Sequence, residues 1–82
     1  MQDLSEKREI KIGKIYRHFK GTLYRVISIC THTESGEVLV VYEQVNDEGK
    51  VWARPYEMYN SLVDKEKYPD NKQKYRFEEI GE

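Results

Sequence analysis

Short runs rich in β-branched and aromatic residues, separated by turn-forming residues, recur along the chain, and this pattern indicates β-strands. The longest such stretch, residues 22–32, is rich in β-branched and aromatic residues and contains neither Gly nor Pro. Both of its faces are partly apolar, with Leu23 and Ile27 on one and Tyr24 and Val26 on the other. A strand that bends around a small barrel, so that its buried face changes along its length, produces this double pattern.

Turn-forming residues divide the rest of the chain into further short strands. Gly21 and Gly36 can supply the positive φ that closes a tight turn, and residues 46–49 have turn chemistry at nearly every position. Pro55 lacks the amide hydrogen that a continuing strand needs. The pattern therefore predicts five strands, over residues 12–19, 22–32, 37–45, 50–54 and 75–80.

Two segments with other patterns separate the last two strands. Residues 56–63 place Tyr59, Leu62 and Val63 at helical spacing, which predicts one or two helical turns packed on an open end of the barrel. Residues 64–74 are almost entirely polar, and we expect a mobile loop there.

Together these elements predict a mainly β fold, a small SH3-like antiparallel barrel of about five strands with a short helical turn before the last strand. Residues 1–10 have no consistent period and are expected to form a frayed N-terminal arm, so the single barrel domain spans residues 11–80. A chain of 82 residues leaves room for only one small domain with a thin core. An OB-type barrel is the alternative, although it normally needs longer strands.

Composition then narrows the class of protein. The chain has 14 basic and 15 acidic side chains, and the net charge of −1 excludes the strong positive field of a protein that lives on nucleic acid. Its longest apolar run, residues 38–42, is too short to cross a bilayer, and no leader segment opens the chain. A single cysteine, Cys30, cannot form an internal disulfide, which fits a reducing compartment. We therefore expect a soluble cytoplasmic protein with no membrane segment.

The charges are nevertheless separated along the sequence. Residues 10–33 contain five basic side chains, both histidines and no acid, whereas residues 34–49 contain five acids and no base. Two neighbouring strands that neutralise each other are the favoured explanation, because cross-strand pairs of opposite charge are common in antiparallel sheets. The alternative is a basic face between Lys14 and Arg25, which predicts a nucleic-acid or ribosome-associated accessory protein.

Catalytic and metal-binding patterns are weak. Cys30, His32 and Glu34 alternate, so an extended strand would present all three on one face, but the paired ligands typical of zinc sites are absent. We therefore interpret Cys30 as a small core residue and His32 as a polar residue at a strand end, and we expect no metal and no cofactor. No Gly-rich phosphate loop, nucleophile elbow or pair of catalytic carboxylates stands out, so we do not expect an enzyme.

The more specific feature is that aromatic and basic side chains gather in the same short motifs. Aromatic faces and guanidinium groups together suit stacking and the capture of anions, which predicts a groove for an anionic small molecule or peptide. Tyr24 and Trp52 have an alternative role in the core, and Arg54 and Arg76 have one in pairing with nearby carbonyls or carboxylates. The expected ligand-binding residues are His18, Lys20, Tyr24, Trp52, Arg54 and Arg76.

A known family carries the same motifs in the same order. From about residue 13 to residue 78, the chain resembles the bacterial domain-of-unknown-function family 1653. The resemblance implies a compact SH3-like fold and no established activity. Glu43-Gln44-Val45-Asn46 departs from the family pattern, because it replaces a more basic and aromatic hairpin end and makes this edge more acidic. Motif matching alone points to five of the six residues above, all but Tyr24. The matching motifs are Tyr16-Arg17-His18-Phe19-Lys20-Gly21, Val40-Val41-Tyr42, Trp52-x-Arg54-Pro55-x-x-Met58-Tyr59 and Arg76-Phe77.

Overall fold

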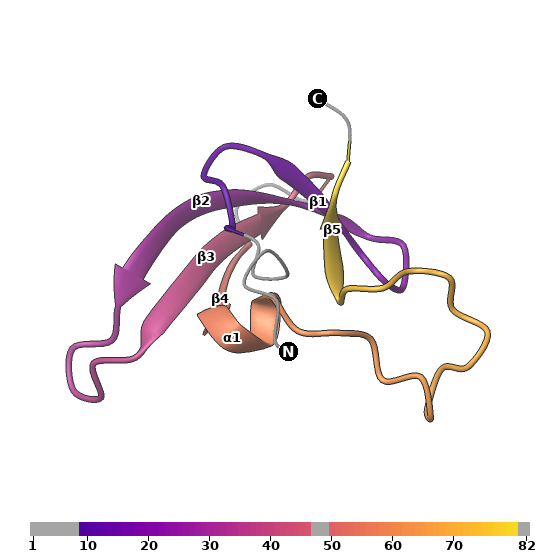
Figure 1. Ribbon diagram of the computed structural model, residues 1–82. Helices are drawn as coiled ribbons and strands as arrows, with labels where there is room; N and C mark the ends of the chain where they lie inside the picture. Colours follow the sequence, from indigo (N-terminus) through magenta and orange to yellow (C-terminus); the bar gives the residue numbers. More distant parts are fainter. Residues whose placement is uncertain (1–8, 47–49, 81–82) are drawn as a thin grey trace.

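Five antiparallel strands form a single sheet in the structure, a computed structural model that describes residues 9–46 and 50–80 (Figure 1). The predicted mainly β fold, with a helical turn before the last strand, is confirmed. Residues 47–49, which belong to one predicted turn, lie outside the described residues. The elements are β1 (Ile15–His18), β2 (Leu23–Thr31), β3 (Val38–Gln44), β4 (Val51–Pro55), α1 (Tyr56–Tyr59) and β5 (Phe77–Glu79).

The sheet is curved but does not close into the expected barrel. Its strand order is β4-β3-β2-β1-β5, so β4 and β5 are the two edges and do not pair with each other. Closure of a barrel requires that pairing. β5 has only three residues and pairs with β1, with Phe77 opposite His18. The fold is therefore an open, arched sheet with α1 beneath its concave side (Figure 1).

A β-bulge in β2 explains why both faces of this strand are partly apolar. The register with β3 shifts between Val26 and Ser28, which inserts one extra residue into β2. Val26 is buried before the shift and Ile29 packs against the core after it, while Ile27 between them is exposed. The predicted change of buried face is thus confirmed. The expectation that Cys30 is a core residue is wrong, because beyond the bulge its side chain is exposed.

The core consists largely of aromatic rings. Tyr59 and Phe77 stack with ring centroids 4.0 Å apart, and the rings of Tyr16 and Tyr42 pack against that pair edge-on. Rings bury much apolar area per residue, which suits a chain with few aliphatic core positions. The buried cluster, called the aromatic core below, comprises Ile10, Tyr16, Val26, Val40, Tyr42, Tyr59 and Phe77.

Tyrosine hydroxyls hold the beginning of the described chain against this core. The backbone N–H of Ile10 donates to the Tyr56 hydroxyl at 2.9 Å, and that of Lys11 donates to the Tyr16 hydroxyl at 3.0 Å. Residues 1–8 of the expected N-terminal arm lie outside the described residues, whereas Ile10, at the end of that arm, is buried. The folded domain therefore includes Ile10.

The segment between β4 and β5 is less regular than its pattern suggests. α1 has only one turn; Tyr59 and Val63 are buried, but Leu62 is 56% exposed, contrary to the predicted packing. Residues 64–74 contain no helix or strand. Their polar side chains reach the β1–β2 hairpin, since the Asn71 side-chain amide donates to the Phe19 carbonyl at 2.8 Å. The mobility of this loop stays a prediction.

No helix in the described part of the chain is long and apolar enough to span a membrane.

Candidate functional site

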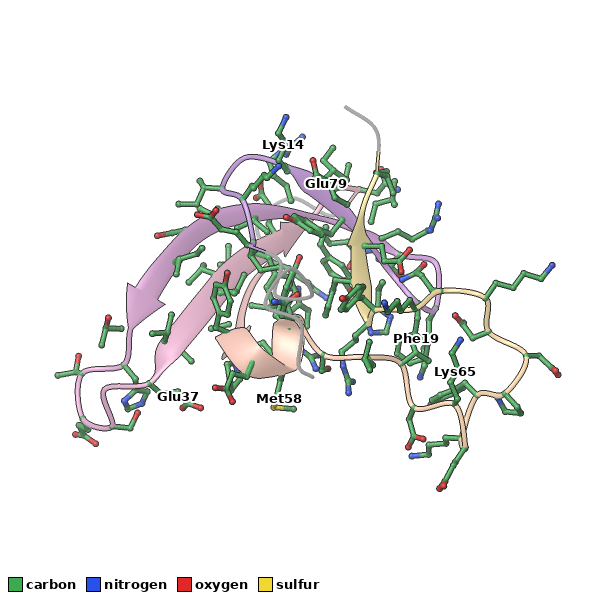
Figure 2. All side chains as sticks on the ribbon, viewed as in Figure 1. Lys14, Phe19, Glu37, Met58, Lys65 and Glu79 are labelled. Atoms are coloured by element: carbon green, nitrogen blue, oxygen red, sulfur yellow. The ribbon has the colours of Figure 1, made fainter. Side chains whose placement is uncertain are left out.

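A pocket of about 320 Å³ lies between the β1–β2 turn, the end of β4 and the segment that leads into β5. Figure 2 labels one of its residues, Phe19, at the end of the sheet where β1 turns into β2. We call it the His18 pocket. Its lining residues are His18, Phe19, Lys20, Arg54, Asp64, Lys67, Tyr68 and Arg76.

The pocket lies on the open side of the sheet, where β4 and β5 do not pair. Arg54 stands opposite Val40 in the β3–β4 register and therefore faces the buried side of the sheet. Its guanidinium carbon lies 5.5 Å from the centroid of the Phe77 ring on β5. Arg76 immediately precedes β5, and His18 ends β1 opposite Phe77. The open side of the sheet thus has side chains from the ends of β1 and β4 and from the segment before β5 around one opening.

Positive charge dominates this pocket. Four cationic side chains line it against one carboxylate, that of Asp64, which gives a local formal charge of 4 − 1 = +3. None of the four forms an ion pair with a carboxylate in the part of the chain that the structure describes. The Asp64 carboxylate instead accepts backbone N–H groups of Glu66 and Lys67 at 3.0 and 3.4 Å. The cations are Lys20, Arg54, Lys67 and Arg76.

Arg54 and Arg76 are each held by a hydrogen bond from their own Nε atom. Arg54 Nε donates to the Tyr42 hydroxyl at 3.2 Å, and Arg76 Nε donates to Ser61 Oγ at 3.1 Å. No hydrogen bond joins the Nη atoms of either side chain to another described residue. Each guanidinium is therefore oriented by a neutral hydroxyl and keeps its two terminal nitrogens for a planar, bidentate contact with an anion.

The electrostatic effect of these cations is visible at His18. Burial, together with the nearby positive charges of Arg54, Arg76 and Lys20, lowers the pKa of His18 from 6.5 to about 4. The imidazole is therefore neutral near pH 7. Its Nδ1 accepts the Lys20 backbone N–H at 3.2 Å, so the proton belongs on Nε2, which is then a neutral hydrogen-bond donor.

Aromatic rings form the outer side of the pocket. The rings of Phe19 and Tyr68 meet edge-to-face with centroids 4.8 Å apart, which joins the β1–β2 turn to the loop before β5. The Lys20 ammonium lies 5.9 Å from the first ring centroid and 5.7 Å from the second. Cation–π attraction thus holds Lys20 at the pocket without neutralising its charge.

Of the six expected binding residues, the structure brings four together around the His18 pocket, namely His18, Lys20, Arg54 and Arg76. Tyr24 lies next to it, half-buried in edge-to-face contacts with Tyr42 and Phe77 at 5.2 and 5.8 Å. Its alternative role, packing against the core, matches this position. Trp52 does not line the pocket and is 46% exposed on the edge strand β4.

The position of Trp52 leads to a stability prediction. Trp52→Ala should lower the free energy of unfolding by about 1 kcal/mol or less, because the half-exposed ring makes no aromatic contact with another described residue. Urea denaturation followed by circular dichroism measures this change. A loss above about 3 kcal/mol, typical of a buried aromatic residue, would place Trp52 in the core after all.

Four lining residues are not among the six expected ones: Phe19 in the β1–β2 turn and three residues of the loop before β5. Asp64, Lys67 and Tyr68 lie in the polar segment that predicts a mobile loop, and nothing in its composition indicates where it packs. The Lys67-Tyr68 pair does repeat the combination of basic and aromatic side chains seen in the other motifs. That repetition is the signal that points to this part of the loop.

A larger hollow of about 570 Å³ lies at the start of β3, beside α1. Figure 2 shows two of its residues, Glu37 and Met58, on the hairpin and α1 side of the molecule, away from Phe19. It is lined by apolar side chains and two carboxylates, those of Glu37 and Glu57, and by none of the six expected residues. Those carboxylates would repel an anion, so the smaller pocket is the better candidate.

The separated charges along the sequence are partly explained by strand pairing. Arg25 and Glu43 stand opposite each other in the β2–β3 register and form an ion pair at 3.4 Å. Lys20 lies at the His18 pocket instead, and Arg17 Nε donates to the Gln73 side chain at 3.2 Å. The basic residues between Lys14 and Arg25 are therefore divided among different surroundings.

The hairpin histidine has a structural role in the β2–β3 turn. His32 Nδ1 accepts the backbone N–H groups of Glu34 and Ser35 at 3.1 and 3.2 Å. Gly36, with φ +77°, completes the turn in a conformation that other residues rarely adopt. Among the residues that the structure describes, no three His, Cys, Asp or Glu side chains are grouped to hold a metal ion.

Comparison with known proteins gives one result. No curated protein and no solved structure matches the chain. The profile of one family, described as a protein of unknown function, matches residues 14–79, a range that contains all five strands and every residue of the His18 pocket. The chain therefore belongs to the family DUF1653.

Proposed function

We propose that this protein is a small binding module of the bacterial cytoplasm that holds an anionic small molecule, or the carboxylate of a peptide, in the His18 pocket. The observation that carries the proposal is that four cationic side chains surround one opening. None of them forms an ion pair with a carboxylate among the residues that the structure describes. Like charges gathered in one place raise the free energy of the folded protein, and a bound anion removes that cost.

The two anchored arginines support the same proposal. A guanidinium fixed at Nε loses less conformational entropy when it binds than a freely rotating one. The neutral His18 adds a donor without adding charge. The exposed thiol of Cys30 is consistent with a reducing cytoplasm, where such groups persist.

An NMR titration tests the proposal. Acetate, phosphate, citrate and a short peptide with a free carboxyl terminus are added to the ¹⁵N-labelled protein at constant ionic strength. We expect shift changes concentrated at His18, Lys20, Arg54 and Arg76, and none at His32 in the distant hairpin.

Two lysine variants provide the matched comparison. Lys67→Gln, at the pocket, should weaken binding by about threefold to tenfold, as expected for one exposed charge. Lys14→Gln should leave binding unchanged, because Lys14 is exposed outside the pocket and hydrogen-bonds to other described residues through its backbone atoms alone. Equal losses in both variants, or shift changes scattered over the surface, would contradict a defined site.

Nucleic-acid binding by the basic residues between Lys14 and Arg25 stays the alternative prediction. It requires affinity for duplex DNA that weakens steeply with salt, with a logarithmic slope of about 0.9 per phosphate contact. Such binding, reduced by Lys14→Gln and unaffected by Lys67→Gln, would favour the alternative over the pocket.

A further inference from the structure

The structure also indicates which anion the His18 pocket suits. We infer that its ligand is a small molecule carrying a phosphoryl group in the dianionic form; this inference rests on the proposed anion-binding function. It follows from the charge of the pocket, from its supply of hydrogen-bond donors and from its size.

The charge of the pocket favours a dianion over a single carboxylate. The pocket has a formal charge of +3 while His18 is neutral. A single carboxylate brings one negative charge and leaves most of that excess in place. A phosphomonoester carries a charge of about −1.5 to −2 near pH 7, so it compensates the pocket more fully.

The hydrogen-bond donors of the pocket come from several segments and exceed what one carboxylate can use. The terminal nitrogens of Arg54 come from β4, and those of Arg76 come from the segment before β5. One guanidinium can already satisfy both oxygens of a carboxylate in a single plane. Two guanidiniums from different segments of the chain, with the Lys20 and Lys67 ammonium groups, suit a tetrahedral group that presents three oxygens in different directions.

The size and the aromatic residues of the pocket favour a compact organic group on the rest of the ligand. A volume of about 320 Å³ is near the lower end of the range for small-molecule pockets, about 300–1,000 Å³, and suits a small molecule. Phe19 and Tyr68 offer the apolar contact area at the pocket, enough for a compact organic group. The remaining lining side chains are polar or charged.

Calorimetric titration of the full chain with inorganic phosphate, methyl phosphate, sulfate and acetate tests this inference. At constant ionic strength near pH 7, both phosphates should bind at least about tenfold more tightly than acetate. Arg76→Gln should reduce phosphate affinity by about tenfold or more, Arg76→Lys should restore part of it, and Lys14→Gln should not change it. A melting curve for each variant shows whether it still folds. Lys67→Gln removes a charge from the pocket at an exposed position, so its loss of binding is separate from any loss of folding.

The pH dependence adds an independent criterion. Lowering the pH toward about 5 protonates a phosphomonoester, whose second pKa is about 6, whereas sulfate remains a dianion. Phosphate affinity should therefore fall and sulfate affinity should not. The charged groups that face His18 in the pocket are Lys20, Arg54, Asp64, Lys67 and Arg76, and sulfate reports any change in them.

The outcomes distinguish failure of anion binding in the His18 pocket from failure of the phosphoryl assignment. If acetate binds as tightly as phosphate and Arg76→Gln weakens both, the pocket binds anions but the phosphoryl inference is overturned. If no anion binds, both proposals fail. A phosphoserine peptide that binds much more tightly than methyl phosphate would overturn the assignment to a small molecule.

Discussion

Replacing Phe77 by Ala is expected to lower the free energy of unfolding by about 3–5 kcal/mol. Phe77 is 1% exposed and stacks on Tyr59 at 4.0 Å, with the Tyr42 ring 5.6 Å away. Rigid rings cannot collapse into the space that the substitution leaves, so the cavity persists. A chain of 82 residues has a total stability of about 4–12 kcal/mol, so this single change removes a large share of it.

Denaturant unfolding of wild type and variant measures this loss, and Phe77→Leu is the matched control. Leu keeps an apolar side chain at the position and should cost no more than about 2 kcal/mol. If Phe77→Ala cost about 1 kcal/mol, the same as the half-exposed Trp52→Ala, the aromatic core would not be the main source of stability.

Stability should also fall as the pH drops from 6.5 toward 4, because of His18. Its pKa is 6.5 in the unfolded chain and about 4 in the folded protein, where burial and the charges of Arg54, Arg76 and Lys20 oppose protonation. Between these two values the unfolded state binds a proton that the folded state does not. Acid therefore favours unfolding in this window, and the His18 contribution is fully present only above 6.5.

The expected loss from His18 is about 1–2 kcal/mol, less than the full pKa difference implies, because water and salt screen a half-exposed ring. The control is His18→Asn, which keeps an acceptor near Nδ1 for the Lys20 N–H but does not titrate. Thermal or urea unfolding at several pH values should show a shallower acid loss in this variant, since carboxylates account for the remainder. Parallel curves for both proteins would contradict the lowered pKa.

The strands were predictable because each carries its own local signal. The apolar run of β3, the glycine turn at Gly36 and the stop at Pro55 depend only on neighbouring residues. The bent course of β2 was also visible in its two partly apolar faces, although the bulge itself could not be placed. Because Ile27 is the inserted residue, the buried face changes there and Cys30 ends up exposed.

Closure of the sheet was not predictable from such local signals. It depends on whether β4 and β5 meet, and these strands are separated by 21 residues, from 56 to 76. In the structure Arg54 reaches the Phe77 ring across the open side instead of a backbone ladder forming there. An arginine near the end of a predicted strand fits either arrangement.

The residues of the candidate site that carry a local sequence signal were predictable, and those placed by contacts between distant segments were not. His18, Lys20, Arg54 and Arg76 stood out because basic and aromatic side chains gather in short motifs. Lys67 was missed because its place depends on contacts between distant segments, such as the hydrogen bond from Asn71 to Phe19, 52 residues away in sequence.

Trp52 was grouped with the site for its residue type, but it lies at the exposed edge of the sheet, outside the pocket lining. Sequence alternation shows which face of a strand a residue shares, and Trp52 does share the face of Arg54. It does not show how far along that face the covering elements extend.

The pKa of His18, followed by NMR in chloride and in sulfate at equal ionic strength with His32 as the reference signal, tests the central claim most directly. If the cations around His18 form an anion site, the pKa is about 4 in chloride and rises by about 1 or more when sulfate fills the pocket. The same pKa in both salts, or the ordinary value of 6.5 in chloride, would contradict that claim.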